Sequence, residues 1–347
     1  MKHHIYILFL LFGHVVHAQT SDWEYTERGE HDFRICFYNL ENLFDYEDDS
    51  LKNDDAFTPE GSYRWTRVKF EKKAMNISKV LIAMGQWELP DIIGVCEIEN
   101  EFAIKHLLYN TPLKKGNYKY VYFQSPDQRG INTALFYRSE KFKVCDSYPI
   151  SLSDSTFKSR DILYVCGVFS NACDDTLHLF VNHWPSRYGG YAATMDKRTQ
   201  AALILRQKID SLLTINPENR ILAMGDFNDY PDDESIRIHL QASLNAHTNK
   251  EGELINMMFP HFEKNNVGTH KYQQHWGILD QMMVSQSLHK TKTGLHTKNT
   301  AHIFNADFLL EPDDHNVGTK PLRTYLGFQY IGGFSDHLPI YVDLLCE

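Results

Sequence analysis

Carboxylate, carboxamide and imidazole groups follow several short apolar runs of this chain, at positions where a buried strand would end. The clearest case is Asp226 with Asn228, which come directly after the apolar run 221–224. The two side chains are two residues apart, so on an extended trace they face the same side. Paired hard oxygen ligands suit Mg²⁺ or Ca²⁺, or a water molecule held for attack. The alternative interpretation is an Asx turn that caps the strand, since both residue types are common in turns.

The same arrangement recurs at other apolar runs. The further groups are Asn39 and Glu41 after residues 34–38, Glu97 after residues 91–96, His183 after residues 177–181, Asp280 within residues 278–284, and Asp336 with His337 before residues 340–345. An unpaired carboxylate at the end of an apolar run is costly, which favours a metal ion or a base as the partner of Glu97. A lone histidine at a strand end, such as His183, is more often structural than catalytic. Arg129 on the turn 125–130 is a candidate phosphate ligand, although most such arginines are simply solvated.

Apolar periodicity predicts the elements that would position these groups. Strands are expected at 34–38, 91–96, 221–224, 278–284 and 340–345, hairpins at 118–124 with 131–137 and at 162–169 with 177–181, and helices at 67–84 and 192–213. The weakly periodic segment 297–330 is expected to form loops, with a lid as one option. Many short buried strands and few helices predict two packed sheets with helices outside, and aligned strand ends would then meet at one rim.

The N-terminus carries the pattern of a secretory signal. Lys2 precedes the apolar run 5–12, and the run 16–18 offers small residues for cleavage, so we expect a signal peptide at 1–18. A membrane anchor is the weaker alternative, because the run is too short to span a membrane. A linker at 19–32 and one catalytic domain at 33–347 would follow. These features predict an exported protein, periplasmic or extracellular, monomeric and without a transmembrane span in the mature chain.

Composition limits the class of partner. The 347 residues are 42% hydrophobic and 23% charged, which is typical of a globular protein, and the formal net charge is -10. Because an acidic protein repels a polyanion at long range, this charge argues against tight, salt-sensitive nucleic-acid binding. It does not exclude a hydrolase that meets phosphate only at its active site.

The six cysteines show no metal-binding spacing. Cys36, Cys96 and Cys166 lie within apolar runs and are expected to be small buried side chains. An exported protein can form disulfides, and Cys166 with Cys173, which flank a turn, is the best candidate pair.

Taken in order, the polar groups resemble the motif series of the endonuclease/exonuclease/phosphatase superfamily, which includes DNase I. The resemblance covers roughly residues 33–347 and rests mainly on GDFN at 225–228 and SDHLP at 335–339. The runs NHWPSR, WGILDQ and GGFSDHLPI look most like exported bacterial nuclease-like members. The resemblance implies a DNase I-like four-layer α/β sandwich, with two packed mixed sheets flanked by helices. It also implies hydrolysis of phosphoester bonds with a divalent ion, Mg²⁺ in the first place and Mn²⁺ or Ca²⁺ as alternatives.

The resemblance also implies a set of ligands. Glu97 would be the main metal ligand, assisted by Asn39, Glu41 and Asp336. Arg129 matches loosely an arginine that binds the substrate phosphate.

The remaining residues would act on water and phosphate. By the resemblance, Asp226 positions or deprotonates the attacking water, and Asn228 orients that water or the phosphate. His337 contacts the scissile phosphate while Asp280 holds its imidazole, and His183 is a candidate acid toward the leaving oxygen. The reaction itself requires groups of this kind, apart from any resemblance, because in-line attack needs a positioned water, charge neutralisation and help for the leaving group.

The sequence therefore predicts a metal-dependent phosphodiesterase, with an endonuclease acting on DNA as the first choice. A phospholipid (sphingomyelinase-like) or inositol-phosphate phosphoesterase shares the chemistry, and a catalytically silent binding protein on the same fold is the alternative from another class. A nuclease would show basic or aromatic groups beside its site despite the acidic total, and the candidates are Arg187, Arg198, Lys271 and Arg323. A lipid hydrolase would instead expose apolar loops.

Overall fold

The structure, a computed structural model, describes residues 28–29, 31–153, 158–170, 172–247, 250–262, 264, 267–298 and 300–347. The expected signal peptide 1–18 and most of the expected linker 19–32 lie outside these residues. Within the described ranges, no helix combines the length and the apolar character needed to cross a membrane.

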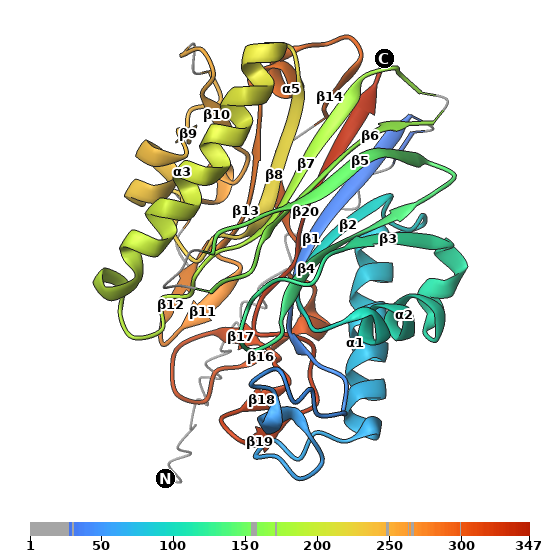
Figure 1. The fold of residues 1–347 in the computed structure, drawn as a ribbon, viewed down its shortest axis with the longest axis vertical. Coiled ribbons are helices and arrows are strands. Elements are labelled where there is room, and N and C mark those ends of the chain that lie inside the picture. The colour runs from blue at the N-terminus through green and yellow to red at the C-terminus, as the bar shows by residue number, and fades with distance from the viewer. Residues whose placement is uncertain are drawn as a thin grey trace, which may run out of the picture.

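The first of two central sheets is built mainly from the beginning and the end of the chain (Figure 1). Its strands are β1 (Asp32–Leu43), β2 (Ile92–Ile98), β3 (Tyr118–Tyr122), β4 (Asn132–Arg138), β14 (Leu295–Thr297), β15 (His302–Ile303) and β20 (Ile340–Cys346). The strand order is β14-β20-β1-β2-β4-β3, and β15 also pairs with β20. The sheet is mixed, because β1 and β2 run parallel while the other pairs are antiparallel.

The second sheet comes from the middle of the chain. Its strands are β5 (Phe142–Ile150), β6 (Ile162–Phe169), β7 (Thr176–His183), β8 (Arg220–Asp226), β9 (Ala242–Ser243), β10 (Leu254–Asn256) and β13 (Asp280–Val284). The strand order is β5-β6-β7-β8-β13-β10-β9. This sheet is also mixed, with β7 parallel to β8 and β9 parallel to β10.

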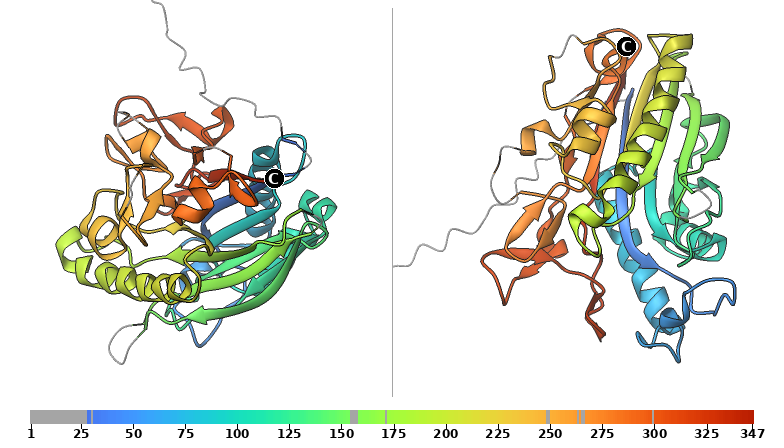
Figure 2. Two further views of the ribbon diagram at one scale, coloured as in Figure 1. Left: turned by 90° about the horizontal axis from the view of Figure 1, so that it is seen from above. Right: turned by 60° about the vertical axis from the view of Figure 1, so that its left-hand side comes forward.

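Helices cover the outer faces of the two sheets, and short hairpins lie near one end of them (Figures 1 and 2). The helices are α1 (Arg67–Gly85), α2 (Glu101–Tyr109), α3 (Tyr191–Ile215), α4 (Phe259–Phe262) and α5 (Gln286–Lys290), with the short turns η1 (Asp55–Phe57), η2 (Pro112–Gly116), η3 (Ser235–His239) and η4 (Asp307–Leu309). The hairpins are β11 (His270–Tyr272) with β12 (His275–Gly277), β16 (Leu310–Pro312) with β17 (Thr319–Pro321), and β18 (Tyr325–Leu326) with β19 (Gln329–Tyr330). In Figure 1, α1 and α2 lie beside the first sheet and α3 lies beside the second.

Strand periodicity explains the layers. In β1, Ile35 and Phe37 face the core between the two sheets, whereas the alternate residues Cys36 and Tyr38 face the core under α1 and α2. Strand β8 divides its side chains in the same way between the inter-sheet core and the core under α3. Because successive side chains of a strand point to opposite faces, a strand that is apolar throughout must be covered on both sides. The predicted fold class, two packed mixed sheets flanked by helices, is confirmed.

Most of the predicted elements are present, with two differences. The expected helices 67–84 and 192–213 are α1 and α3, within two residues at each end. Strand β5 was not predicted, since seven of its nine residues are at least partly exposed and it contains Pro149, as an edge strand can. The segment 297–330 is not only loop, because it contains β15, η4 and the two hairpins β16–β17 and β18–β19.

The predicted disulfide between Cys166 and Cys173 is wrong. Cys173 instead forms a disulfide with Cys346, and their Cα atoms are 5.9 Å apart. Cys166 lies on β6 with its side chain in the core under α3, so it cannot reach past the turn. Cys36, Cys96 and Cys166 are buried, as expected, and all three are free. Sequence proximity misled the prediction, because the true partner is brought close by the final strand of the other sheet.

Candidate active site

Three candidate side chains lie next to one another at one end of the second sheet, which we call the rim. His183 at the end of β7 is in register with Asp226 at the end of β8, and Asp226 is in register with Asp280 at the start of β13. Gly225 permits this close packing, because a Cβ atom there would lie 2.3 Å from the carbonyl oxygen of Asn182. The glycine of the GDFN run is therefore required by the approach of β7 to β8 just before the polar residues.

The GDFN run forms the Asx turn, and the same carboxylate also faces the other candidate groups. Oδ1 of Asp226 accepts the backbone N–H of Asn228 at 2.9 Å, which is the Asx turn, and Asn228 has a positive φ of 53°. Oδ2 of Asp226 faces the rim and accepts the amide of Asn39 at 3.1 Å. Phe227 points away and is buried under α3. The turn thus orients the second carboxylate oxygen toward the other candidate groups.

Asp280 and His337 form a buried pair. Nδ1 of His337 lies 2.6 Å from Oδ2 of Asp280. Burial by itself lowers the pKa of His337, but the carboxylates of Asp280 and Asp226 outweigh it and raise the pKa well above its ordinary value. His337 is therefore an imidazolium at neutral pH, with Nε2 3.9 Å from Oδ2 of Asp226.

His183 has the opposite charge state. Its Nε2 lies 3.5 Å from Oε1 of Glu97 and 3.8 Å from Oδ2 of Asp226. Burial and the nearby guanidinium of Arg160 hold the pKa of His183 well below its ordinary value, so it is neutral. Burial raises the pKa of Asp226 to about 7, even though the positive charge of His337 opposes this rise. One carboxylate thus faces a charged and a neutral imidazole within 4 Å.

The candidate metal ligands Glu97, Asn39 and Asp336 come from three different segments. Oε2 of Glu97 accepts the backbone N–H of Asn42 at 2.9 Å, while Oε1 faces only His183 among the described residues. Glu97 has a φ of 60°, a backbone conformation that non-glycine residues rarely adopt and that is often found at functional sites. One oxygen of Glu97 and one of Asp336 make no hydrogen bond within the described ranges, so hard oxygen donors face the rim.

Glu41 lies in an ion-pair network that occupies its carboxylate. Oε1 accepts from Arg323 at 3.2 Å, and Oε2 accepts from Lys73 at 3.3 Å and from the backbone N–H of Thr324 at 2.7 Å. Arg323 also donates to Oδ2 of Asp336 at 2.9 Å. Burial raises the pKa of Asp336, but Arg323 and then His337 outweigh it and lower the pKa to about 2. Glu41 would have to lose one of these partners to bind a metal ion, so the structure gives it a different surrounding from Glu97.

His270 was not singled out from the sequence, and it lies against this centre. Its ring centroid is 4.8 Å from that of His337, and burial with the charge of His337 lowers its pKa to about 4. Ligand atoms of His270, Asp336 and His337 lie within 4.8 Å of one another, as do those of Asp226, Asp280 and His337. Both groups depend on His337, whose Nδ1 is bonded to Asp280 and which is protonated, so neither offers it as a ligand. We therefore favour the oxygen donors around Glu97 as the place for a metal ion.

Arg160, rather than Arg129, is the arginine built into the rim. Arg160 is buried, with Nη1 3.3 Å from Oδ2 of Asp127 and Nη2 2.6 Å from the carbonyl of Trp184, and its Nε has no partner in the described ranges. Arg129 is about half exposed, and its Nε lies 3.8 Å from Asp127. Arg160 just precedes β6 and carries no motif, so only its burial and its effect on His183 mark it.

The four basic residues expected to flank the site are already paired. Their partners are Asp229 and Asp233 for Arg187, Asp229 for Arg198, Asp313 for Lys271, and Glu41 and Asp336 for Arg323. Arg198 is fully buried. The rim therefore presents little free positive charge from these residues, in keeping with the acidic total.

Comparison with known proteins agrees with this arrangement. The model of the Endonuclease/Exonuclease/phosphatase family matches residues 34–345. An endonuclease/exonuclease/phosphatase family protein from Bacteroides thetaiotaomicron has a similar structure, with a TM-score of 0.52, 17% identity and coverage of 91% of this chain and 95% of that one. The structure of D. rerio TDP2 complexed with single strand DNA product has a TM-score of 0.54 and 16% identity, with coverage of 90% of this chain and 98% of that one. The mannosyl-6-phosphatase of Bacteroides thetaiotaomicron has a TM-score of 0.52 and 16% identity, with coverage of 90% of this chain and 99% of that one. Among curated proteins, none matches the chain significantly.

At these identities the solved structures establish the fold, and the family model establishes the membership. Members of this family hydrolyse phosphoester bonds and in general use a divalent metal ion. The chain belongs to the Endonuclease/Exonuclease/phosphatase family.

Proposed function

We propose that the chain is a metal-dependent phosphodiesterase that cleaves nucleic acid, DNA in the first place, by in-line attack of water. The observation that carries this proposal is Asp226, whose Oδ2 lies within 4 Å of the charged His337 and of the neutral His183. Such a set can position a water molecule and stabilise negative charge on a phosphate at the same time.

The oxygen donors at the rim fit a hard divalent ion. We assign Glu97 as the main ligand, with Asn39 and Asp336 assisting, because each can present an oxygen that Mg²⁺, Mn²⁺ or Ca²⁺ prefers. A bound ion of this kind neutralises charge on phosphate oxygens and lowers the pKa of a bound water. We assign Glu41 to holding Lys73 and Arg323 rather than to the first set of ligands.

The chain's own residues would divide the remaining work. His337 would donate Nε2–H to a phosphate oxygen, held in orientation by Asp280. Asp226 would orient the attacking water and accept its proton, helped by the amide of Asn228. Because His183 is neutral, we assign it a hydrogen bond to the phosphate or leaving oxygen rather than proton donation from an imidazolium.

Relatives of the same fold leave the substrate open between polymers and small esters. D. rerio TDP2 is seen in complex with a single strand DNA product, and another neighbour is a mannosyl-6-phosphatase. We favour nucleic acid because aromatic side chains line a cavity beside the candidate active site. The Cys173–Cys346 disulfide supports export, because disulfides persist in oxidising compartments.

The test is turnover by the purified chain without residues 1–18. Single-stranded DNA, duplex DNA, sphingomyelin, an inositol phosphate and mannose 6-phosphate would each be incubated with Mg²⁺ and, separately, with EDTA. We expect cleavage of DNA that requires Mg²⁺. Hydrolysis of sphingomyelin or of the phosphate monoesters without cleavage of DNA would contradict the assignment of DNA as the substrate. No turnover of any compound would contradict the proposal that the chain is an enzyme.

A further inference from the structure

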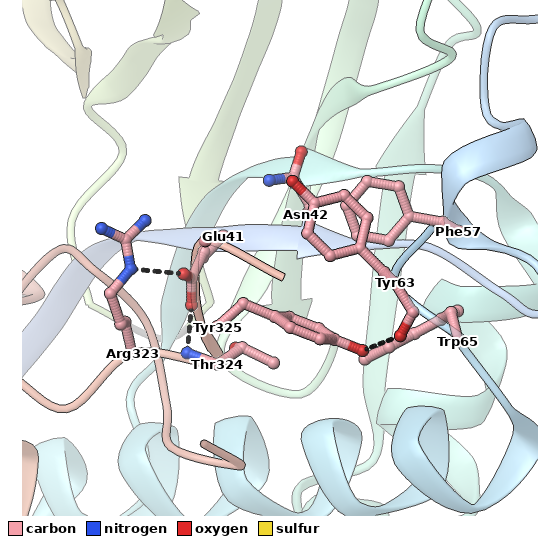
Figure 3. A pocket seen from close by; sticks show the side chains of 9 residues that line it. Glu41, Asn42, Phe57, Tyr63, Trp65, Arg323, Thr324 and Tyr325 are labelled. Carbon is pink, nitrogen blue, oxygen red and sulfur yellow. Dashed lines mark hydrogen bonds and ion pairs between the residues drawn. The ribbon is translucent and has the colours of Figure 1, made fainter. Parts of the chain in front are cut away.

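A small cavity of about 190 Å³ opens beside the candidate active site (Figure 3). Its walls come from the end of β1, from the loop that connects β1 to α1, and from the hairpin β18–β19 with the residues before it. A cavity of this size is smaller than the pockets that hold drug-sized ligands, so it fits one ring-sized group.

Four of the nine lining residues are aromatic, and their side chains are held in place. The ring of Phe57 stacks between those of Phe44 and Tyr63, with centroids 4.3 Å and 4.7 Å away, so Phe57 holds Tyr63 in place. The ring of Tyr325 meets Tyr63 edge-on at 4.8 Å. The hydroxyl of Tyr325 donates to the carbonyl of Tyr63 at 2.8 Å, and the indole N–H of Trp65 donates to the carbonyl of Phe44 at 3.1 Å. Prearranged aromatic faces bind a flat ring by stacking, without loss of side-chain freedom.

Two residues place this cavity next to the catalytic centre. The backbone N–H of Asn42 is bonded to Glu97, the proposed metal ligand, while its side chain lines the cavity. Arg323 lines the cavity too and donates to Asp336, which precedes His337. A group that enters the cavity would therefore be attached close to the phosphate under attack.

The polar groups of the cavity that make no hydrogen bond within the described ranges are few. They can bind the polar edge of one flat ring, but not several hydroxyl groups. Within the described ranges, the side-chain amide of Asn42, the hydroxyl of Tyr63 and Nη1 of Arg323 make no hydrogen bond. Glu41 has its carboxylate engaged by three donors, and the hydroxyl of Thr324 is bonded to Lys73. A sugar ring would find few partners for its hydroxyl groups, whereas a nucleobase needs two faces and one edge.

The mouth of the cavity adds a second stacking surface. Phe328, at the tip of hairpin β18–β19, is 70% exposed, and its ring centroid is 5.3 Å from that of Tyr63. An exposed aromatic ring beside this cavity offers a further face on which an unpaired base can stack.

We propose that this aromatic cavity binds the unstacked nucleobase of a nucleotide next to the scissile phosphate, so that the enzyme prefers single-stranded nucleic acid. A base that is paired and stacked in a duplex cannot enter without being extruded. The inference rests on the proposed nuclease function and adds its substrate class. It also accounts for an acidic chain on DNA, because recognition comes from stacking more than from phosphate charge.

The first test compares two single-stranded hexanucleotides with Mg²⁺, one of six thymidines and one with an abasic deoxyribose at one central position. Cleavage at both phosphates next to that position is measured for the wild type and for Tyr63→Leu, which removes the ring but keeps an apolar side chain. We expect the wild type to cleave one of the two phosphates at least about tenfold more slowly beside the abasic residue. Tyr63→Leu should show less than about threefold difference between the oligonucleotides, because its base-binding wall is gone.

Two matched variants control this test. Tyr63→Phe keeps the stacking face and should retain most of the discrimination. Trp87→Leu removes an aromatic side chain that is 88% exposed at the other end of α1, roughly 28 Å along the helix, and should behave as the wild type. Thermal unfolding of each variant checks that it is folded.

A second measurement separates failure of the cavity from failure of catalysis. Binding of the two labelled hexanucleotides is followed by fluorescence anisotropy in EDTA, so it does not depend on turnover. The proposal expects about tenfold weaker binding of the abasic oligonucleotide by the wild type and no difference for Tyr63→Leu. Equal binding of both by the wild type would overturn the nucleobase assignment and leave the sugar or phosphate as the recognised part. Base-dependent binding without cleavage would overturn the nuclease function and keep the cavity.

Discussion

Buried charges gather at both ends of the central sheets, and the two groups differ in how completely they are paired. At the end of β1 far from the rim, Arg34 donates through Nε and Nη2 to both oxygens of Asp343, each at 2.7 Å. At the rim, and among the described residues, Oε1 of Glu97 has only His183 near it, and Nε2 of His337 has no partner closer than Asp226 at 3.9 Å.

The comparison shows that burial of charge does not by itself mark a functional site. The pair at the far end satisfies its own bonding capacity and joins β1 to β20, so its role is structural. The groups at the rim are oriented by turns and neighbours yet leave donors and acceptors open, which is what binding a substrate requires. Variants at the two ends should therefore separate activity from stability.

The largest expected effect is on activity at the rim. His337→Ala should lower kcat on DNA by roughly 10²–10⁴-fold, because it removes the charged imidazole that we assign to the phosphate. The measurement is steady-state kinetics with Mg²⁺, with circular dichroism to confirm folding. Activity within threefold of the wild type would show that the His337–Asp280 pair is as structural as the pair at the far end.

The opposite outcome is expected at the far end. Asp343→Ala should lower the free energy of unfolding by about 3–5 kcal/mol, because the buried guanidinium of Arg34 loses the carboxylate that balances its charge. Urea unfolding measures this change, and kcat of the folded enzyme should stay within twofold. The double variant Arg34→Met with Asp343→Leu should recover much of the stability, and a loss of activity in that variant would break the distinction between the two ends.

Asp91 gives the far end a pH dependence of its own. Although Arg28 opposes it, burial raises the pKa of Asp91 to about 6, above the value of about 3.9 for an unfolded chain. Between about pH 4 and pH 6 the folded state therefore binds more protons than the unfolded state. The free energy of unfolding should fall through this window by up to about 1.4 kcal/mol per pH unit as pH rises.

The measurement for Asp91 is urea unfolding at pH 4.5, 5.5 and 6.5. Asp91→Asn should remove the contribution of this group to the pH dependence of the free energy of unfolding, while DNA cleavage at neutral pH stays unchanged. If the free energy of unfolding depends on pH with the same slope in the wild type and the variant, the guanidinium of Arg28 already keeps Asp91 ionised in this range.

The smallest expected effect concerns salt. Since the four basic residues first expected beside the site are paired, few phosphates should be neutralised on binding. Two phosphate contacts predict a slope of about -1.4 for log affinity against log salt on single-stranded DNA. A slope several times steeper, measured by anisotropy between 50 and 200 mM NaCl, would show that a basic surface and not the aromatic cavity dominates binding.

Residues that belong to regular elements could be located from the sequence. Short continuous apolar runs revealed the strands that carry Asp226 and Glu97 near their ends, and a 3.6-residue period revealed α1 and α3. Strand β5 escaped because an edge strand with partial exposure has no apolar run to detect. His270 and Arg160 escaped for another reason, since a single residue without a motif is marked only by its spatial neighbours.

The sequence by itself determined the layered fold and the convergence of the polar groups, because strand and helix periodicity is local and aligned strand ends must meet at one rim. Only the tertiary structure decided which groups pair. It joined Cys173 to Cys346, engaged Glu41 with Lys73 and Arg323, and assembled an aromatic cavity from segments more than 200 residues apart. These choices depend on how two sheets and their connecting loops pack, and packing brings together residues whose spacing along the chain carries no signal.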